Sequence, residues 1–386
     1  MSESLSPDAV IDAARQETGL DDFGGDSFRE GLEVYCESLV AEAALNELGV
    51  AALEANLVRN LANRLRVVDW RNRHPEVGGE VIESPVFIIG LFRAGTTLLS
   101  QLLDLDFGSR SLLGWEAQDS VPPPTLATHR NGPRVDDARA RAEVLDQINP
   151  RMKTIHDEEP DGPTECIAVL SQDFKALLWE SIANVPRYGE WLLAADHRSA
   201  YEYHRHCLQV LQSGGVRGRW ALKSPHHAIA LDALTAVYPD ARLVYLHRDP
   251  ATVVASACSL MQCLTGTFSD ADHRAYIARR WTLVLTECVT RVDEFRRRAP
   301  EHPVLDLQYA DLVAAPLDAV ARVYDFAGRA FDSGAEKAVV AHLDAHPRGH
   351  HGVHRYDFAG AGLNEQELRD RFGAYIDRYG VRPERS

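Results

Sequence analysis

Several features that would place a chain in a specialised protein class are missing from this 386-residue sequence. Its six cysteines are scattered and form no Cys-x-x-Cys pair, which predicts reduced, buried thiols rather than a disulfide or zinc framework. No apolar run approaches the ~18 residues that a membrane span needs. The first residues are acidic and polar, unlike a secretory leader. We therefore expect a cytoplasmic protein without integral membrane contact.

Positive charge is also in short supply. The chain has 41 basic against 57 acidic residues, which gives a formal net charge of −16. A field of this sign repels polyphosphate, so a general nucleic-acid surface is not expected. Any anionic ligand must instead be held by a local pocket.

What the sequence does contain is an alternation of short apolar runs with helical patterns. The runs lie at residues 85–90, 220–223, 242–246 and 303–307, and each precedes a segment with helical spacing. This alternation predicts an α/β fold, a P-loop-like parallel sheet flanked by helices. The functional loops are then expected at the carboxyl ends of the strands.

The same patterns suggest where the parts of the chain begin and end. Residues 1–78 read as a helical N-terminal lobe packed on the core, followed by a break at His74-Pro75 and Gly78-Gly79. Residues 79–386 then form the α/β domain, with a helical insertion at about 136–217. Aromatic residues such as Trp115, Phe174 and Trp179 are candidates for an acceptor pocket, although in helical segments such residues more often form core.

The first candidate site follows the run at 85–90 and reads Gly90-Leu-Phe-Arg-Ala-Gly95-Thr96-Thr97. Its two glycines have the spacing of a P-loop between a strand and a helix. A nucleoside-triphosphate P-loop has Lys directly after the second glycine, whereas this chain has Thr96 there and carries its cation within the loop, as Arg93. The structural alternative is a tight strand–helix turn with an incidental Arg.

Such a loop can still bind an anion, because backbone N–H groups and the positive end of a helix converge there. A phosphosulfate fits this cradle, with Arg93 placed to stabilise the charge that develops as a sulfuryl group leaves. The predicted binding residues of the loop are Arg93, Ala94, Gly95, Thr96 and Thr97.

The second candidate site lies at residues 219–260, which read RWALKSPHHAIALDALTAVYPDARLVYLHRDPATVVASACSL. This segment closely resembles the 3′-phosphate-binding region of sulfotransferases that use 3′-phosphoadenosine 5′-phosphosulfate (PAPS), especially their bacterial branch. The resemblance extends over about residues 85–330 and implies that Arg248 and Ser256 bind the 3′-phosphate. A planar guanidinium and a hydroxyl eight residues later suit that task. The structural alternatives are an ion pair of Arg248 with Asp249 and a helix-surface hydroxyl at Ser256.

The family resemblance also implies an activity. The chain is expected to move a sulfuryl group from PAPS to a hydroxyl of a small-molecule, lipid or glycan acceptor, giving 3′-phosphoadenosine 5′-phosphate (PAP) and a sulfate ester without a metal. Arg355, in His354-Arg355-Tyr356, is a looser candidate for a donor-phosphate contact. Whether the chain forms a homodimer is left open.

The residue that takes the acceptor's proton is also left open. Lys223 resembles a lysine that steadies the transferring group, and His226 follows it, but the spacing departs from the family because Pro225 intervenes. In carbohydrate-sulfating branches the base is a Glu shortly beyond the phosphate loop, which corresponds to Glu116. We favour Glu116 over His226, against the alternative that Glu116 is a helix-end carboxylate.

Two other functions compete with sulfuryl transfer. One is a metal-dependent P-loop kinase or nucleotidase, which the missing lysine after Gly95 disfavours. The other is a catalytically inactive nucleotide-binding protein. A metal site at His346, His350, His351 and His354 is allowed by spacing, but a polar loop is the favoured interpretation.

Overall fold

The computed structural model describes residues 3–106, 108–151, 159–346, 358 and 360–384. The chain forms two compact units. A helical unit comprises residues 1–82, 112–217 and 263–273, and a sheet unit comprises residues 83–111, 218–262 and 274–386. The N-terminal helices and the whole of the predicted insertion thus belong to the same unit.

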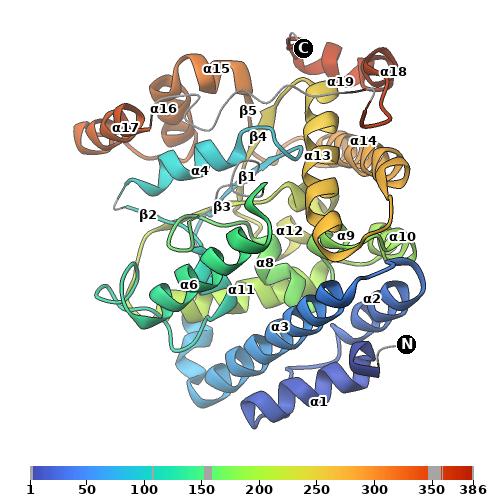
Figure 1. The fold of residues 1–386 in the computed structure, drawn as a ribbon. Helices are drawn as coiled ribbons and strands as arrows, with labels where there is room; N and C mark the ends of the chain where they lie inside the picture. The colour runs from blue at the N-terminus through green and yellow to red at the C-terminus, as the bar shows by residue number, and fades with distance from the viewer. Residues whose placement is uncertain (1–2, 107, 152–158, 347–357, 359, 385–386) are drawn as a thin grey trace. The chain divides into compact units, whose positions relative to one another are not determined.

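The sheet unit is built on five parallel strands in the order β2-β3-β1-β4-β5 (Figure 1). The strands are β1 Val86–Gly90, β2 Ser109–Arg110, β3 Arg219–Lys223, β4 Arg242–His247 and β5 Val304–Gln308. Four of them coincide with the apolar runs, and the predicted α/β fold class is confirmed. The two-residue edge strand β2 was not predicted, because two residues are too short to show any periodicity.

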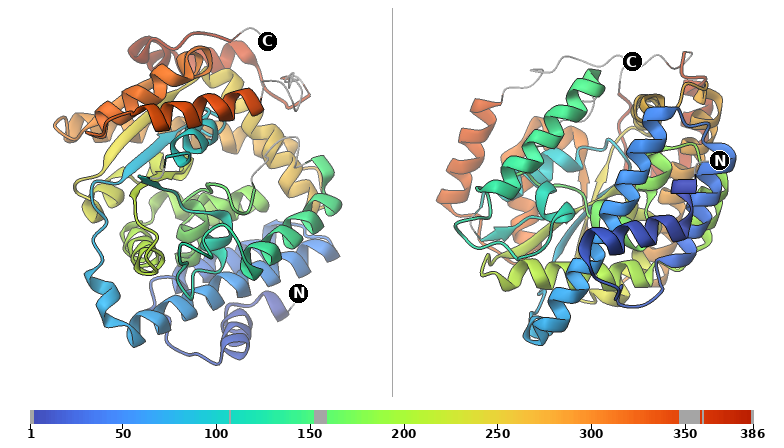
Figure 2. Two further views of the ribbon diagram at one scale, coloured as in Figure 1. Left: turned by 90° about the vertical axis from the view of Figure 1, so that its left-hand side faces the viewer. Right: turned by 60° about the horizontal axis from the view of Figure 1, so that its bottom comes forward.

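Alternate residues of the central strand β1 face different helical layers, as the period of two in a strand requires. Ile88 packs in a core cluster with Leu99 of α4 (Thr96–Asp104) and Val320 of α16 (Pro316–Phe326). On the other side, the Phe87 ring contacts the rings of His227 and Tyr238. Helix α16 contacts both α4 and α17 (Ser333–Ala345), and Figure 2 shows α16 and α17 next to each other.

The remaining elements of the sheet unit follow the carboxyl ends of β3, β4 and β5. They are η4 Pro225–Ile229, α12 Leu231–Val237, α14 Arg274–Arg298, α15 Tyr309–Ala314, α18 Glu365–Arg371 and α19 Gly373–Tyr379. This order places the loops after β1, β3 and β4 at one edge of the sheet.

Helix α13 (Pro250–Phe268) begins in the sheet unit and ends in the helical unit. By length and composition it is apolar enough to cross a membrane, which corrects the expectation that no segment approaches a span. Because 61% of its apolar 18-residue stretch is buried inside the protein, it has the character of a core helix. It also carries Ser256.

The helical unit contains the long helix α3 (Glu47–Arg73), which ends before the predicted break at His74. Among the described residues, the other α-helices that lie wholly in this unit are α1 Pro7–Thr18, α2 Arg29–Glu42, α5 Gly114–Gln118, α6 Pro133–Ile148, α8 Ile167–Leu170, α9 Leu177–Ile182, α10 Pro186–Ala194 and α11 Arg198–Ser213. Phe174 stacks on Trp179 with ring centroids 5.0 Å apart, and both are fully buried. These two aromatic residues are therefore core residues.

A buried charge network fixes the centre of the helical unit. Asp173 accepts hydrogen bonds from Arg64 Nη1 at 2.9 Å, Lys175 Nζ at 3.0 Å and Ser199 Oγ at 2.6 Å. Burial alone would raise the pKa of Asp173, but the positive charges of Arg64 and Lys175 outweigh it and the pKa is lowered. The carboxylate thus stays ionised between two buried cations.

Candidate functional site

The loop between β1 and α4 has an unusual backbone. Arg93 adopts a left-handed conformation with φ 65°, and Gly95 has φ 94°. A Cβ at Gly95 would come within 2.6 Å of Tyr309 Cδ2, so both the conformation and the space require glycine there. A non-glycine residue with positive φ, such as Arg93, is sparsely populated and concentrates at functional sites.

Helix α4 begins directly after this loop. Gly95 is its N-cap residue, and no side chain caps the first turn, whose N–H groups form the positive end of the helix. Thr96 is buried at the first helical position. Ala94 is buried as well and closes a turn by donating its N–H to the Leu91 carbonyl at 3.1 Å. The cradle for an anion predicted from the sequence thus has the required backbone.

Lys223 reaches the same helix end from the last position of β3. Its side chain is buried, and Nζ donates to Thr97 Oγ1 at 3.1 Å. The pairing of Ile88 with Lys223 between β1 and β3 fixes this register. An ammonium group therefore lies beside the hydroxyls of the loop.

Arg93, Arg248 and Ser256 come together although they are far apart in the sequence. Arg93 Nε donates to Ser256 Oγ at 3.3 Å, and Arg248 Nη1 donates to the Arg93 carbonyl at 2.6 Å. The Arg248 guanidinium also lies 4.0 Å above the Tyr309 ring centroid, a cation–π contact. The two predicted anion-binding segments thus form one cluster at the carboxyl ends of β1 and β4.

Arg248 has a further partner that the sequence did not suggest. Its Nε and Nη2 donate to the Glu384 carboxylate at 2.7 and 2.9 Å. The neighbouring Asp249 lies 3.0 Å from Arg369 of α18. No motif or periodicity points to Glu384, because its role depends on the chain returning to β4 after α19.

A polar network around the buried His247 supports Arg248 from the preceding residue. His247 is fully buried and lies 2.8 Å from Asp306, which also accepts two bonds from Arg296. Burial tends to raise the pKa of Asp306, but the hydrogen bonds from His247 and Arg296 lower it to about 2. Burial lowers the pKa of His247. A neutral imidazole beside an ionised carboxylate therefore holds the end of β4.

The two candidate bases lie in different units. The His226 side chain is fully buried in η4 of the sheet unit, and the backbone N–H of this residue donates to Ser224 Oγ at 3.2 Å. Glu116 is fully buried in the helical unit, where Oε2 accepts the Leu113 N–H at 3.1 Å and caps α5. His129 Nε2 lies 3.6 Å from Glu116 Oε1. Glu116 is thus a helix-end carboxylate, as the structural alternative held, but a buried rather than a solvated one.

Some predicted residues lie outside the described part of the chain. These are Arg355 and the histidines at 350, 351 and 354. Within the described residues, no group of three or more His, Cys, Asp or Glu side chains is arranged to hold a metal ion.

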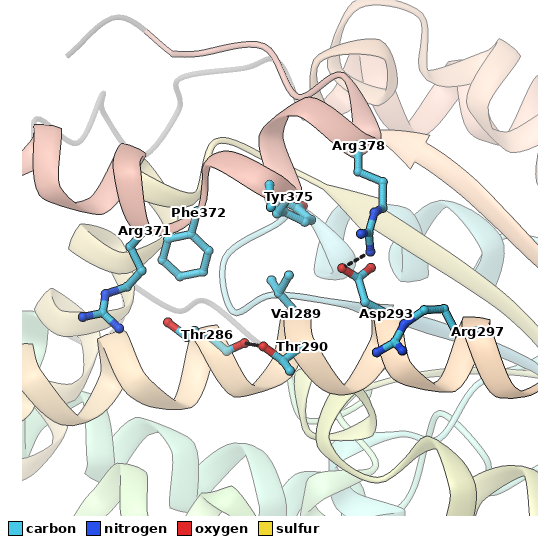
Figure 3. Close-up of a pocket in the computed structure, with 10 residues that line it drawn as sticks. Thr286, Val289, Thr290, Asp293, Arg297, Arg371, Phe372, Tyr375 and Arg378 are labelled. Atoms are coloured by element: carbon cyan, nitrogen blue, oxygen red, sulfur yellow. Dashed lines mark hydrogen bonds and ion pairs between the residues drawn. The ribbon is translucent and has the colours of Figure 1, made fainter.

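The sheet unit also has a pocket of about 330 Å³ where α18 and α19 meet α14 (Figure 3). Phe372, Tyr375 and Val289 give it an apolar floor. Arg378 points to Asp293 and forms an ion pair with it. None of the site residues predicted from the sequence lines this pocket.

Comparison with known proteins decides the family. The model of the sulfotransferase family matches residues 85–333, which include Arg93, Arg248 and Ser256. The chain belongs to the sulfotransferase family. The family predicted from the two sequence motifs is therefore confirmed.

This sulfotransferase is similar to two mycobacterial crystal structures. Sulfotransferase STF9 from Mycobacterium avium is 31% identical, superimposes with a TM-score of 0.92 and is covered completely, as is this chain. Sulfotransferase STF1 from Mycobacterium tuberculosis H37Rv is 32% identical with a TM-score of 0.85, over 95% of this chain and 98% of that one.

A further relative is named omega-hydroxy-beta-dihydromenaquinone-9 sulfotransferase Stf3, from Mycobacterium bovis and Mycobacterium tuberculosis. It is 24% identical over 259 residues, which make up 64% of this chain. The match spans 63% of the length of these curated relatives.

Proposed function

We propose that this protein transfers a sulfuryl group from PAPS to the hydroxyl of an acceptor, releasing PAP and a sulfate ester. The observation that carries the proposal is the convergence of Arg93, Arg248 and Ser256, linked by contacts of 2.6 and 3.3 Å. One nucleotide with phosphate groups at both its 5′ and 3′ positions can bridge the helix end of α4 and the Arg248–Ser256 pair. Family membership supports the same reaction.

In this proposal the loop binds the 5′ end of the donor. The first-turn N–H groups of α4 and the hydroxyls of Thr96 and Thr97 hold the phosphosulfate. Arg93 and Lys223 stabilise the negative charge that grows on the bridging oxygen as the bond between sulfur and that oxygen breaks. These cations are arranged before the reaction, so little reorganisation is needed.

The acceptor oxygen forms the new bond to sulfur, and its proton must pass to a base. Glu116 and His226 remain the two candidates. Both side chains are fully buried, but the bond from the Leu113 N–H gives Glu116 a structural task that a general base would have to share. Only two residues separate His226 from Lys223 in the sequence. His226 also lies in the same unit as Arg93, Arg248 and Ser256. We now propose His226 ahead of Glu116.

We propose a hydroxylated small molecule, lipid or glycan as the acceptor, and a cytoplasmic location for the enzyme. The name of the Stf3 relative describes a hydroxylated menaquinone, which supports a hydroxyl of a lipid-like compound as one such acceptor. We propose that the reaction needs no metal, because arginine and lysine supply the positive field.

Mass spectrometry tests this function. The protein is incubated with PAPS and an extract of the producing cell, and compounds that gain the mass of one sulfuryl unit are sought. We expect such a gain with the wild-type protein and not with Arg93→Ala. Absence of any product, together with tighter binding of ATP-Mg than of PAP, would favour a kinase or nucleotidase instead.

A further inference from the structure

The carboxylate of Glu384 lies on the side edge of the Arg248 guanidinium. Two nearly parallel bonds, 2.7 Å from Nε and 2.9 Å from Nη2, join the two groups. A guanidinium offers the same planar pair of donors to two phosphate oxygens. Glu384 is thus placed like an anionic ligand of Arg248.

Arg248 is held in place by groups other than Glu384. Its Nη1 donates to the Arg93 carbonyl at 2.6 Å, and its guanidinium stacks 4.0 Å above the Tyr309 ring. These contacts fix the plane of the guanidinium from two sides. Glu384 can therefore leave while Arg248 keeps its position.

The backbone of Glu384 is tied to the loop after β4. The Glu384 N–H donates to Asp249 Oδ2 at 2.7 Å, and Arg369 contacts both Asp249 at 3.0 Å and the Glu384 carbonyl at 3.5 Å. The Glu384 side chain itself is 34% exposed. The backbone anchor keeps the carboxylate near Arg248, and solvent gives the side chain room to swing away.

We infer that Glu384 is an internal competitor for the 3′-phosphate of the nucleotide. The inference rests on the proposed function, in which Arg248 binds that phosphate. A carboxylate and a phosphate dianion cannot share one guanidinium edge, because their charges repel. The nucleotide must displace Glu384 from Arg248 when it binds, and the carboxylate returns when PAP leaves.

The competition has a specific signature. Only a ligand with a 3′-phosphate meets Glu384, so 5′-AMP, which lacks that group, binds without displacing it. Neutralising Glu384 should therefore tighten PAP binding and leave 5′-AMP binding unchanged. Because the pair is partly exposed, we expect a gain of about fivefold in PAP affinity.

Calorimetric titration of the full chain with PAP and with 5′-AMP tests the inference. The variant is Glu384→Gln, and Asp377→Asn on the exposed face of α19 is the matched control for loss of one negative charge. We expect Glu384→Gln to lower the dissociation constant of PAP about fivefold, with 5′-AMP and the control unchanged. An unchanged or weaker affinity for PAP, or an equal gain for 5′-AMP, overturns the inference.

Arg248→Ala separates this inference from the proposed function. If Arg248→Ala weakens PAP binding but Glu384→Gln does not tighten it, the inference that Glu384 competes with the 3′-phosphate is wrong, and the assignment of Arg248 to the 3′-phosphate site is kept. If Arg248→Ala leaves PAP binding unchanged, the 3′-phosphate site itself is wrong. In the double variant the gain from Glu384→Gln should disappear, and thermal melting checks that each variant is folded.

Discussion

Asp173 of the helical unit is fully buried between Arg64 and Lys175, whereas Glu384 of the sheet unit is 34% exposed on the edge of Arg248. Both carboxylates accept short bonds from cations. The side chain of Asp173 is closed to solvent, while Glu384 lies at the end of a sheet where loops meet. Ion pairs thus serve stability in one unit and are open to exchange with a ligand in the other.

The largest expected effect is the loss of stability when the buried ion pairs of the helical unit are removed. Asp173→Asn leaves Arg64 and Lys175 as buried charges without their carboxylate, which should lower the free energy of unfolding by about 3–5 kcal/mol. Urea denaturation measures this change. Asp311→Asn in the sheet unit, which removes the exposed pair with Arg382, should change it by less than about 0.5 kcal/mol. Equal losses of unfolding free energy in Asp173→Asn and Asp311→Asn would contradict the view that the buried pair contributes more to stability than the exposed one.

A second prediction concerns the chemistry of the sheet unit. Arg93→Ala should slow sulfuryl transfer by about 10²- to 10³-fold, because the loop loses the charge that stabilises the leaving oxygen. The rate is followed as mass gain of the acceptor. Arg93→Lys should retain part of the activity, and the free energy of unfolding should stay within about 1 kcal/mol of the wild-type value. A full rate in Arg93→Ala would remove Arg93 from the mechanism.

The backbone of the loop gives a third prediction. Gly95→Ala puts a Cβ against Tyr309 in a left-handed conformation, so we expect a loss of about 1–3 kcal/mol in the free energy of unfolding and weaker PAP binding. Gly373→Ala is the matched control, because a Cβ there meets nothing within 4 Å. Similar behaviour of the two variants in denaturation and PAP titration would show that the loop tolerates a side chain.

The last prediction concerns the pH dependence of the helical unit. Burial lowers the pKa of His204 to about 3, so the folded state keeps it neutral while the unfolded state takes up a proton below about pH 6.5. Its contribution to stability is present above pH 6.5 and is lost as the pH falls toward 3. His204→Gln should flatten the fall by up to about 1.4 kcal/mol per pH unit in urea titrations between pH 6.5 and 4. An unchanged slope would exclude His204 as the cause.

The contrast between the units also explains what the sequence could predict. Strands β1, β3, β4 and β5 were predicted because each coincides with a short apolar run of the sequence, although β5 at the edge of the sheet is mostly half-buried. Arg93 was predicted from the loop motif, and Arg248 and Ser256 from the family resemblance. They lie together because parallel strands bring their carboxyl ends to one edge of the sheet. The loop's positive φ at Arg93 and the packing of Tyr309 on Gly95 needed coordinates.

Contacts between residues that are far apart in the sequence were not predicted. Arg64 and Asp173 are 109 residues apart, and Arg248 and Glu384 are 136 residues apart, with no spacing rule that connects them. Glu116 was assessed by its distance from the loop along the chain, which says nothing about its burial or its bond to the Leu113 N–H. Side chains in such positions follow from the fold and not from local pattern.

The proposed function requires one site that holds both ends of the donor nucleotide. Calorimetric titration of PAP in the presence of a metal chelator, on the wild-type protein and on Arg248→Ala, tests it. We expect metal-independent binding that Arg248→Ala weakens by about 1.5–3 kcal/mol, or about 10- to 150-fold. Equal affinities of the two proteins for PAP, or binding of the wild type only with a divalent metal, would contradict it.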